Sequence, residues 1–235
     1  MKKYLVTIVL VCMVVSAMAV EIPKQGFGLH IGYAQPILRL NTNTSKDSLA
    51  TVIKMNGFKV GLVYDASYAA GFGSSRGINY TFATSNSGWK SKNAYGMDYP
   101  RSRQMITYHE FEVFVDWQYK FEIAKETYLM LYSGPSIQCG IAMDMRVDKQ
   151  DYEGQPTDTK RYNGYVNDVP DQLFKRINVT WGVGAGFQYQ RYFVRGGYDF
   201  GLIVPYKNAD FQNGNHTRGR LDQWNVKIGM YLWYE

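Results

Sequence analysis

The chain has 235 residues, of which 46% are hydrophobic and 20% charged, and its formal net charge is +6 at pH 7. A mean hydropathy of −0.32 excludes a membrane protein built of several apolar helices, because each such helix needs a long apolar run. The 20 Tyr, 12 Phe and 23 Gly residues exclude a disordered chain and favour β-structure. Two cysteines cannot form a disulfide scaffold, and the mild charge gives no reason to expect nucleic-acid binding.

The first residues predict an export signal. Met1–Lys3 is basic, residues 4–16 are almost continuously apolar, and Ala17-Met18-Ala19 is a small-x-small cleavage site. This order is typical of a secretory signal peptide, and the apolar run is short for the alternative of an uncleaved anchor. We therefore expect a signal peptide over 1–19 and one domain over 20–235.

Along eight segments of the remaining chain, bulky residues alternate with small or polar ones. In one of them Phe58, Val60 and Leu62 alternate with Lys59 and Gly61. A period of two is typical of a strand whose two faces meet different environments. The predicted strands are 26–33, 58–65, 77–82, 110–119, 129–141, 177–189, 194–202 and 223–234.

A soluble sandwich also alternates, but two further features favour a membrane. The connections alternate between short and long, as in outer-membrane barrels with short periplasmic turns and long extracellular loops; the long ones are 39–56, 84–105, 144–175 and 204–219. Aromatic residues gather near strand ends, as in an interfacial girdle; they are Phe27, Tyr64, Trp117, Tyr119, Phe187, Tyr189, Tyr192 and Tyr234. We expect an all-β, eight-stranded antiparallel transmembrane up-and-down barrel.

In a barrel this small the polar strand face must fill the lumen with side chains. Unpaired charges there would be costly, so we expect a network of ion pairs that plugs the barrel. The predicted lumenal charges are Lys59, Asp65, Glu110, Glu112, Asp116, Arg195, Asp199 and Lys227.

The last strand carries a motif of the type polar-x-Gly-x-x-hydrophobic-x-aromatic, filled by Lys227, Gly229, Leu232 and Tyr234. With this motif and the run Tyr132–Pro135, the chain resembles the porin-like outer membrane protein beta-barrel family of small eight-stranded, PorT-like barrels. The resemblance covers residues 26–235 and implies that the barrel-assembly machinery reads the motif during insertion. The chain departs from the family pattern by ending on Glu235 rather than on the aromatic residue.

Few residues suggest catalysis. Gly182–Gly186 lacks the spacing of a nucleotide-binding loop, and we interpret its glycines as lumenal positions beside bulky neighbours. A lipid-acting enzyme would need a base such as His109 with Glu110 or Glu112, but adjacent strand residues point to opposite faces, so His109 and Glu110 diverge, and no serine is clearly placed nearby. No histidine pair has metal-ligand spacing. We therefore expect no enzyme, no cofactor and no metal site.

Two long connections are candidates for binding. Residues 84–105 combine aromatic and basic side chains that suit lipopolysaccharide phosphates or a protein partner, and a loop packed over its own barrel is the alternative; they are Trp89, Lys90, Lys92, Tyr95, Arg101 and Arg103. Residues 144–175 are longer than a structureless connection normally needs, as functional or mobile loops tend to be, and the alternative is that part of them continues the strands as a hairpin.

These patterns predict a Gram-negative outer-membrane protein that contacts outer-membrane lipid and lipopolysaccharide. Its expected role is structural, in surface interaction, or in assembly of an envelope or export complex through the external loops. The alternatives are a narrow pore or carrier for small hydrophilic or lipidic ligands, and an enzyme acting on lipid A or phospholipid.

Overall fold

The computed structural model describes residues 25–43, 48–69, 71–89, 101–151, 153–165, 175–203 and 216–235. The predicted signal peptide over 1–19 lies outside these residues. Within them, no helix has the length and apolar character to span a membrane.

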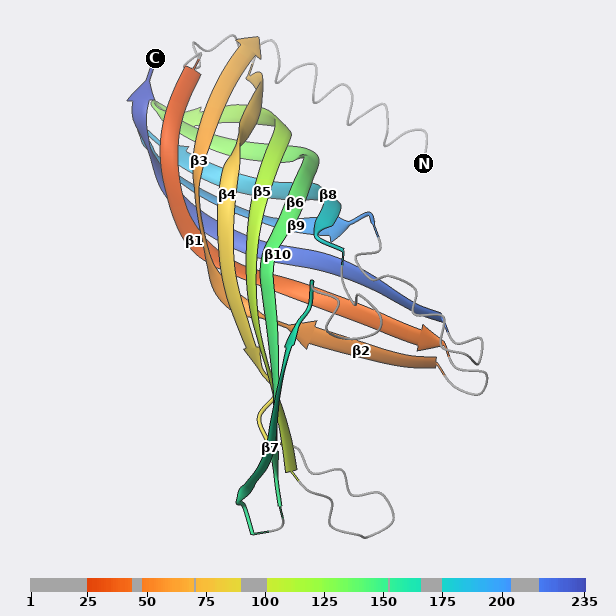
Figure 1. Cartoon of the computed structure of the whole chain (residues 1–235). Coiled ribbons are helices and arrows are strands. Elements are labelled where there is room, and N and C mark those ends of the chain that lie inside the picture. The colour runs from red at the N-terminus through yellow and green to blue at the C-terminus, as the bar shows by residue number, and fades with distance from the viewer. Residues whose placement is uncertain are drawn as a thin grey trace.

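The described chain forms ten strands, eight of which close into a ring (Figure 1). The ring order is β10-β9-β8-β6-β5-β4-β3-β1, every neighbour is antiparallel, and β10 pairs back onto β1 from Gly26↔Tyr234 to Asn43↔His216. The predicted eight-stranded antiparallel barrel is therefore confirmed. The strands are β1 (Gln25–Asn43), β2 (Ser48–Lys54), β3 (Asn56–Ala69), β4 (Phe72–Asn86), β5 (Arg101–Ala124), β6 (Thr127–Gln150), β7 (Pro156–Asn163), β8 (Ile177–Tyr189), β9 (Tyr192–Gly201) and β10 (His216–Tyr234).

Two strands lie in segments that were expected to be long connections. β7 pairs with β6, so of the two interpretations of 144–175 the structure bears out the alternative, a hairpin. The interpretation of 39–56 as a connection is wrong, because β1 continues to Asn43 and β2 folds back along it. The inward side chains of Leu38 and Ile53 there join an apolar cluster, and this burial stabilises the extra pairing.

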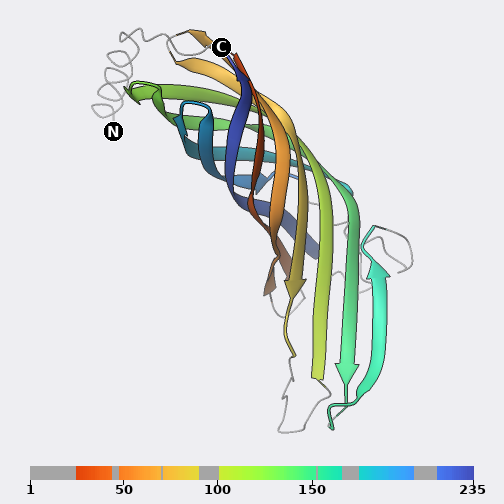
Figure 2. The same cartoon turned by 90° about the vertical axis from the view of Figure 1, so that its left-hand side faces the viewer.

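At the end of the barrel away from the short turns, the strands continue as two sheets that point in different directions (Figures 1 and 2). We call the first the β2 blade: β2 with residues 35–43 of β1 and 216–222 of β10. The second is the β7 blade: β7 with residues 101–109 of β5 and 142–150 of β6. The short turns and the paired ends Gln25 and Glu235 lie at the opposite end.

The outward face of the ring is apolar, and we call this surface the apolar band. Ile31, Val113, Ile137 and Ile228 come from four different strands and are 56%, 56%, 55% and 59% exposed. Such a continuous apolar surface needs an apolar environment or a partner, because soluble monomers expose only small apolar patches.

The interior has two apolar layers with polar residues between them. One layer lies at the base of the blades and contains Leu38, Met55, Ala83, Ile106, Tyr108, Met143, Tyr165 and Leu221. The other lies toward the short turns and contains Val63, Phe114, Met130, Phe193 and Tyr231. Side chains therefore fill the barrel at both levels.

The end of β10 departs from strict alternation. Leu232 forms a β-bulge, because Phe27 pairs with Trp233 while Gly28 pairs with Tyr231. The bulge turns Tyr234 inward, where its ring stacks on Tyr231. The prediction that Tyr234 belongs to the outward aromatic girdle is therefore wrong, and Trp233 is exposed in its place.

Candidate functional site: the charged lumen and the β7 blade

The first lumenal ion pair joins β3 to β5. The ammonium of Lys59 donates to Glu112 over 2.5 Å and also to Gln223, and neither charged side chain is more than 5% exposed. Glu112 also accepts a hydrogen bond of 3.0 Å from the side-chain amide of Asn79, and the amide oxygen of Asn79 bonds the ring of His30. Three strands, β3, β4 and β5, thus meet at one carboxylate, and Gln223 of β10 and His30 of β1 extend the network across the lumen.

A second cluster surrounds Asp65 nearer the short turns. Its carboxylate accepts from Arg195 over 2.7 Å and from Tyr231, and Lys120 lies 3.2 Å away. Arg195 also donates to Ser75 over 2.7 Å. Two buried cations therefore depend on one buried anion, which makes Asp65 the side chain whose loss leaves most charge uncompensated.

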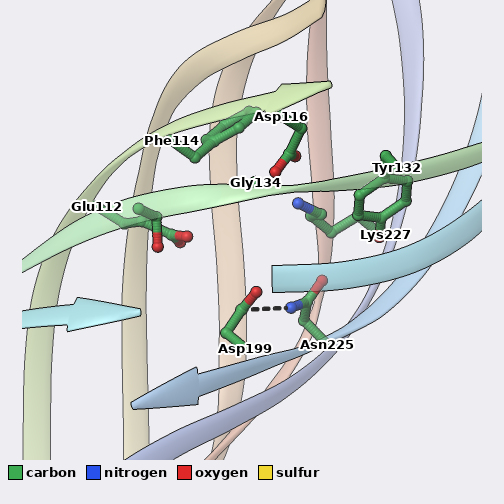
Figure 3. Close-up of a pocket in the computed structure, with 9 residues that line it drawn as sticks. Glu112, Phe114, Asp116, Tyr132, Gly134, Asp199, Asn225 and Lys227 are labelled. Carbon is green, nitrogen blue, oxygen red and sulfur yellow. Dashed lines mark hydrogen bonds between the residues drawn. The ribbon is translucent and has the colours of Figure 1, made fainter. Parts of the chain in front are cut away.

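Between these clusters is a cavity of about 10 Å³, which has room for about one water molecule. Asp116, Asp199 and Lys227 point toward it, and Asn225 donates to Asp199 over 3.0 Å (Figure 3). The hydroxyl of Tyr132 also lies there without a hydrogen-bond partner among the described residues. A single water would satisfy it, so this position suits hydration rather than passage of a solute.

The filled interior bears on the pore alternative. We expect the protein in planar lipid bilayers to show no stepwise conductance at neutral pH, because ion pairs and two apolar layers occupy the lumen. The double variant Lys59→Ala with Glu112→Ala is the comparison: it removes one ion pair from the lumen, so conductance should appear there rather than in the unaltered protein. Stable conductance steps from the unaltered protein would contradict this expectation.

All eight predicted lumenal charges lie inside the barrel. Seven of them are buried, and the eighth, Asp199, is partly buried and lines the small cavity with Asp116 and Lys227. Sequence reasoning missed Lys120, which is 2% exposed. The signal for it was available, because Lys120 continues the inward parity of Asp116 and Gln118 one step beyond the predicted end of the strand at Tyr119.

The structure separates the candidate catalytic pair. His109 lies on the outer face, where its Nδ1 bonds the hydroxyl of Tyr80 at 2.7 Å. Glu110 lies inside and accepts from the hydroxyl of Tyr108 over 2.6 Å. The two side chains cannot act on one substrate from opposite sides of the wall. The described residues also contain no group of three or more His, Cys, Asp or Glu side chains that could hold a metal ion.

The predicted binding residues of the 84–105 segment are only partly described. Lys90, Lys92 and Tyr95 lie outside the described residues, and only the backbone of Arg101 is described. Trp89 and Arg103 come together toward the outer end of the β7 blade, where Arg103 is opposite Asp148, with the guanidinium carbon 4.8 Å from the centre of the indole ring.

Arg103 is held from its other side by Asp148 of β6. Its Nη2 donates to Asp148 over 2.8 Å, and the same carboxylate accepts from Arg146 over 2.7 Å and from Thr159 over 3.1 Å. These three donors link β5, β6 and β7 into one surface. Hydrogen bonds from the two guanidinium groups lower the pKa of Asp148 from its ordinary value of 3.8 to about 2.

The Asp148 contacts predict acid resistance of the β7 blade. A carboxyl whose pKa is lowered on folding stabilises the fold above its ordinary pKa, and this contribution disappears as the pH falls through the lowered value. We expect the stabilisation that Asp148 contributes to be complete above about pH 4 and lost near pH 2. An NMR titration of the Asp148 carboxyl checks this. The variant Arg103→Ala should move the midpoint upward, and an ordinary midpoint in the unaltered protein would show that the contacts do not persist in solution.

The residues of the predicted assembly motif lie on both faces of β10. Lys227 points into the lumen, with its ammonium 5.2 Å from the ring centre of Phe114. Gly229 lies against Phe193, Leu232 is exposed at the bulge, and Tyr234 accepts at its hydroxyl from Gln188 over 2.5 Å. Recognition of this motif by the barrel-assembly machinery stays a prediction.

No protein-family model matches the chain, and no curated protein is similar to it in sequence. The similarity to a PorT-like family in particular therefore has no support from these comparisons. Solved structures with a similar arrangement include Ail, the attachment invasion locus protein of Yersinia pestis, at 12% identity over 90% of this chain and 100% of that one, with a TM-score of 0.35.

Neisserial surface protein A is similar at 12% identity over 87% of this chain and 96% of that chain, with a TM-score of 0.38. The N-terminal β-barrel domain of Pseudomonas aeruginosa OprF is similar at 9% identity over 84% and 97%, with a TM-score of 0.26. Similarity at this level bears on fold alone, and the fold of this chain is established by its own strand pairing.

Proposed function

We propose that this protein is a barrel of a Gram-negative outer membrane, with its short turns in the periplasm and its two blades outside the cell. The observation that carries the proposal is the inverted polarity of a closed ring. Large apolar side chains are exposed outward on the ring strands, while charged side chains such as Lys59 and Glu110 are fully buried inside. A soluble barrel needs the reverse arrangement.

Closure supports the same proposal. In lipid, every backbone donor and acceptor needs a partner within the protein, and a ring in which β10 pairs with β1 has no free edge. Beyond the ring, β2 and β7 each have an edge with no partner strand among the described residues, so they belong to the part of the protein that water can reach.

For the role itself, we propose surface interaction through the β7 blade, without enzymatic activity or a cofactor. Asp148 links three strands and holds Arg103 in place, and Arg103 lies over the ring of Trp89, so an aromatic ring and a cation are presented together. Such pairs are common at binding surfaces because they bind with little loss of side-chain freedom.

A groove of about 660 Å³ crosses the base of the same blade and supports this role. Arg146 and Arg161 face each other across the β6–β7 pair at one end of the groove, and Asp144 and Asn163 do so at the other. Both ends thus offer polar groups to a partner, and on β5 Met105 lies beside Arg146 and Thr107 beside Asp144.

Cysteine labelling in intact cells tests the orientation. In a Cys139→Ser background, Lys160→Cys on β7 should react with a membrane-impermeant maleimide, whereas Lys125→Cys in the β5–β6 turn should react only after lysis. Heat-modifiable gel migration and fractionation with the outer membrane should accompany it. Recovery as a soluble periplasmic protein without a heat shift, or labelling of the turn alone, would overturn the proposal.

Photo-crosslinking tests the surface role. A photoreactive residue at Thr159 should give a discrete adduct with a protein or a glycolipid on cells, and the matched position Ile137, which is 55% exposed on the apolar band, should give only membrane-lipid adducts. The substitution Arg103→Ala should weaken the Thr159 adduct. Identical products from both positions would refute a binding role for the blade.

A further inference from the structure

Three cations lie on the outward face of the β2 blade, on three adjacent strands. Arg39 of β1 is directly opposite Arg220 of β10, and Lys54 of β2 is opposite Ile37, two residues before Arg39. Their chain neighbours Leu38, Ile53 and Leu221 point inward into the apolar cluster, so alternation turns the three cations outward.

The position of the cations relative to the apolar band is informative. The last exposed aromatic residues of the band on these three chain segments are Tyr33, Phe58 and Trp224. Lys54 and Arg220 are each four residues beyond them, and Arg39 is six residues beyond Tyr33. A strand rises about 3.3 Å per residue, so a spacing of four to six residues along a tilted strand places the cations at the depth of the lipid headgroups, next to the apolar core.

Both arginines are held in place by one buried carboxylate. Asp222 is fully buried, and its Oδ2 accepts from Arg39 Nε over 3.0 Å and from Arg220 Nη2 over 2.9 Å. Tyr198 donates to Oδ2 over 2.9 Å, and the backbone amide of Gly201 donates to Oδ1 over 3.0 Å. The carboxylate is thereby saturated, so it fixes the guanidinium groups without covering them.

The cations keep binding capacity after these contacts. The side chains of Arg39 and Arg220 are 46% and 49% exposed, and Lys54 is exposed as well. One carboxylate balances only one of the two guanidinium groups, so this group of four side chains carries an excess of two positive charges. Guanidinium groups with free N–H donors in fixed positions suit the oxygens of a phosphate group.

We propose that Arg39, Lys54 and Arg220 bind the phosphate of an anionic lipid in the leaflet on the blade side of the barrel. The inference rests on the proposed membrane location and deepens it by naming the lipid chemistry and the residues. A lipid is favoured over free phosphate because the site borders the apolar band, where acyl chains would lie beside Trp224 and Tyr33.

Native mass spectrometry of the protein released from nanodiscs tests this. The nanodiscs contain phosphatidylcholine with diphosphorylated lipid A, and heat-modifiable migration is checked first. We expect the unaltered protein to retain lipid A preferentially, and Arg39→Gln with Lys54→Gln to retain about tenfold less, as expected from the loss of two charge-assisted contacts. The matched control, Lys125→Gln with Arg191→Gln in the short turns, removes the same charge and should retain lipid A like the unaltered protein.

The outcomes separate the two proposals. Failure to enter nanodiscs or to show a heat shift counts against the membrane location itself. Normal insertion without lipid A preference, or equal loss in both double variants, overturns only the lipid site. Lys54→Gln alone leaves the Asp222 contacts intact and should still lower retention, which guards against misfolding of the double variant. Binding of inorganic phosphate in detergent with no lipid preference would also refute a lipid ligand.

Discussion

Replacing Asp65 with alanine is expected to destabilise the barrel by about 3–5 kcal/mol, the range for breaking a buried ion pair from one side. The substitution would leave Arg195 and Lys120 buried without their anion, since their side chains are only 4% and 1% exposed. It would also remove the acceptor of the Tyr231 hydroxyl. Urea unfolding of the protein in lipid vesicles, followed by tryptophan fluorescence, measures the change.

A matched control is available on the surface. Asp158 lies 3.9 Å from Lys160, and both side chains are about half exposed. Asp158→Ala should therefore change the free energy of unfolding by less than about 1 kcal/mol, as is usual for exposed pairs. A loss below about 1 kcal/mol for Asp65→Ala as well would show that water reaches the lumenal cluster and screens it.

A double-mutant cycle isolates the ion pair from the cavity that alanine creates. Arg195→Met removes the partner that lies 2.7 Å from Asp65 while keeping much of its volume. The combined variant should lose less stability than the sum of the two single variants, by about 1–3 kcal/mol, because residues in contact are not additive. Exact additivity would contradict a direct interaction between Asp65 and Arg195.

The alternation of side chains carried most of the fold prediction. A period of two follows from strand geometry, so residues such as Lys59 and Lys227 were assignable to the inner face before any pairing was known. The closed order of the strands followed from the alternation of short and long connections. The period of two along the strand also places Gly184 on the inner face, beside Tyr132, where an added Cβ would come within 2.3 Å of the ring.

Pairing between the lumenal charges was not predictable. Asp65 and Arg195 are 130 residues apart and lie on β3 and β9, which are not neighbours in the ring. Whether they meet depends on how far each strand is shifted along the barrel axis, and this shift is a property of the closed ring rather than of any one strand. A single bulge changes it locally, as the inward turn of Tyr234 shows.

The blades were also hard to predict, for a different reason. Beyond the apolar band both faces of a strand meet water or a partly buried cluster, so the contrast that marks a strand weakens. Arg39 and Asp222 are charged residues on the outer face, and Asp222 is nevertheless fully buried. The interpretation of 39–56 as a connection failed because β2 turns both Val52 and Lys54 outward, so its sequence does not mark a strand, although it pairs along β1 and packs Ile53 inward.

The seam between β1 and β10 should be sensitive to one methyl group. A Cβ added at Gly32 would lie 2.0 Å from the carbonyl oxygen of Val226 and 2.6 Å from the Cα of Lys227. Both are backbone atoms of the facing strand, so the seam would have to separate for alanine to fit. We expect Gly32→Ala to cost about 1–3 kcal/mol or more, as overpacking does, and to lower the yield of the heat-modifiable form.

Gly196 provides the comparison, because it lies in β9 beside the same strand. A Cβ added there would meet its nearest atom, Val226 Cγ2, at 3.6 Å, which is ordinary van der Waals contact. Gly196→Ala should therefore be neutral or slightly stabilising, since alanine restricts the unfolded chain more than glycine does. Equal refolding yields for the two variants in lipid vesicles would mean that the seam tolerates separation. A selective loss for Gly32→Ala would instead identify the β1–β10 pairing as the contact on which the closed barrel depends.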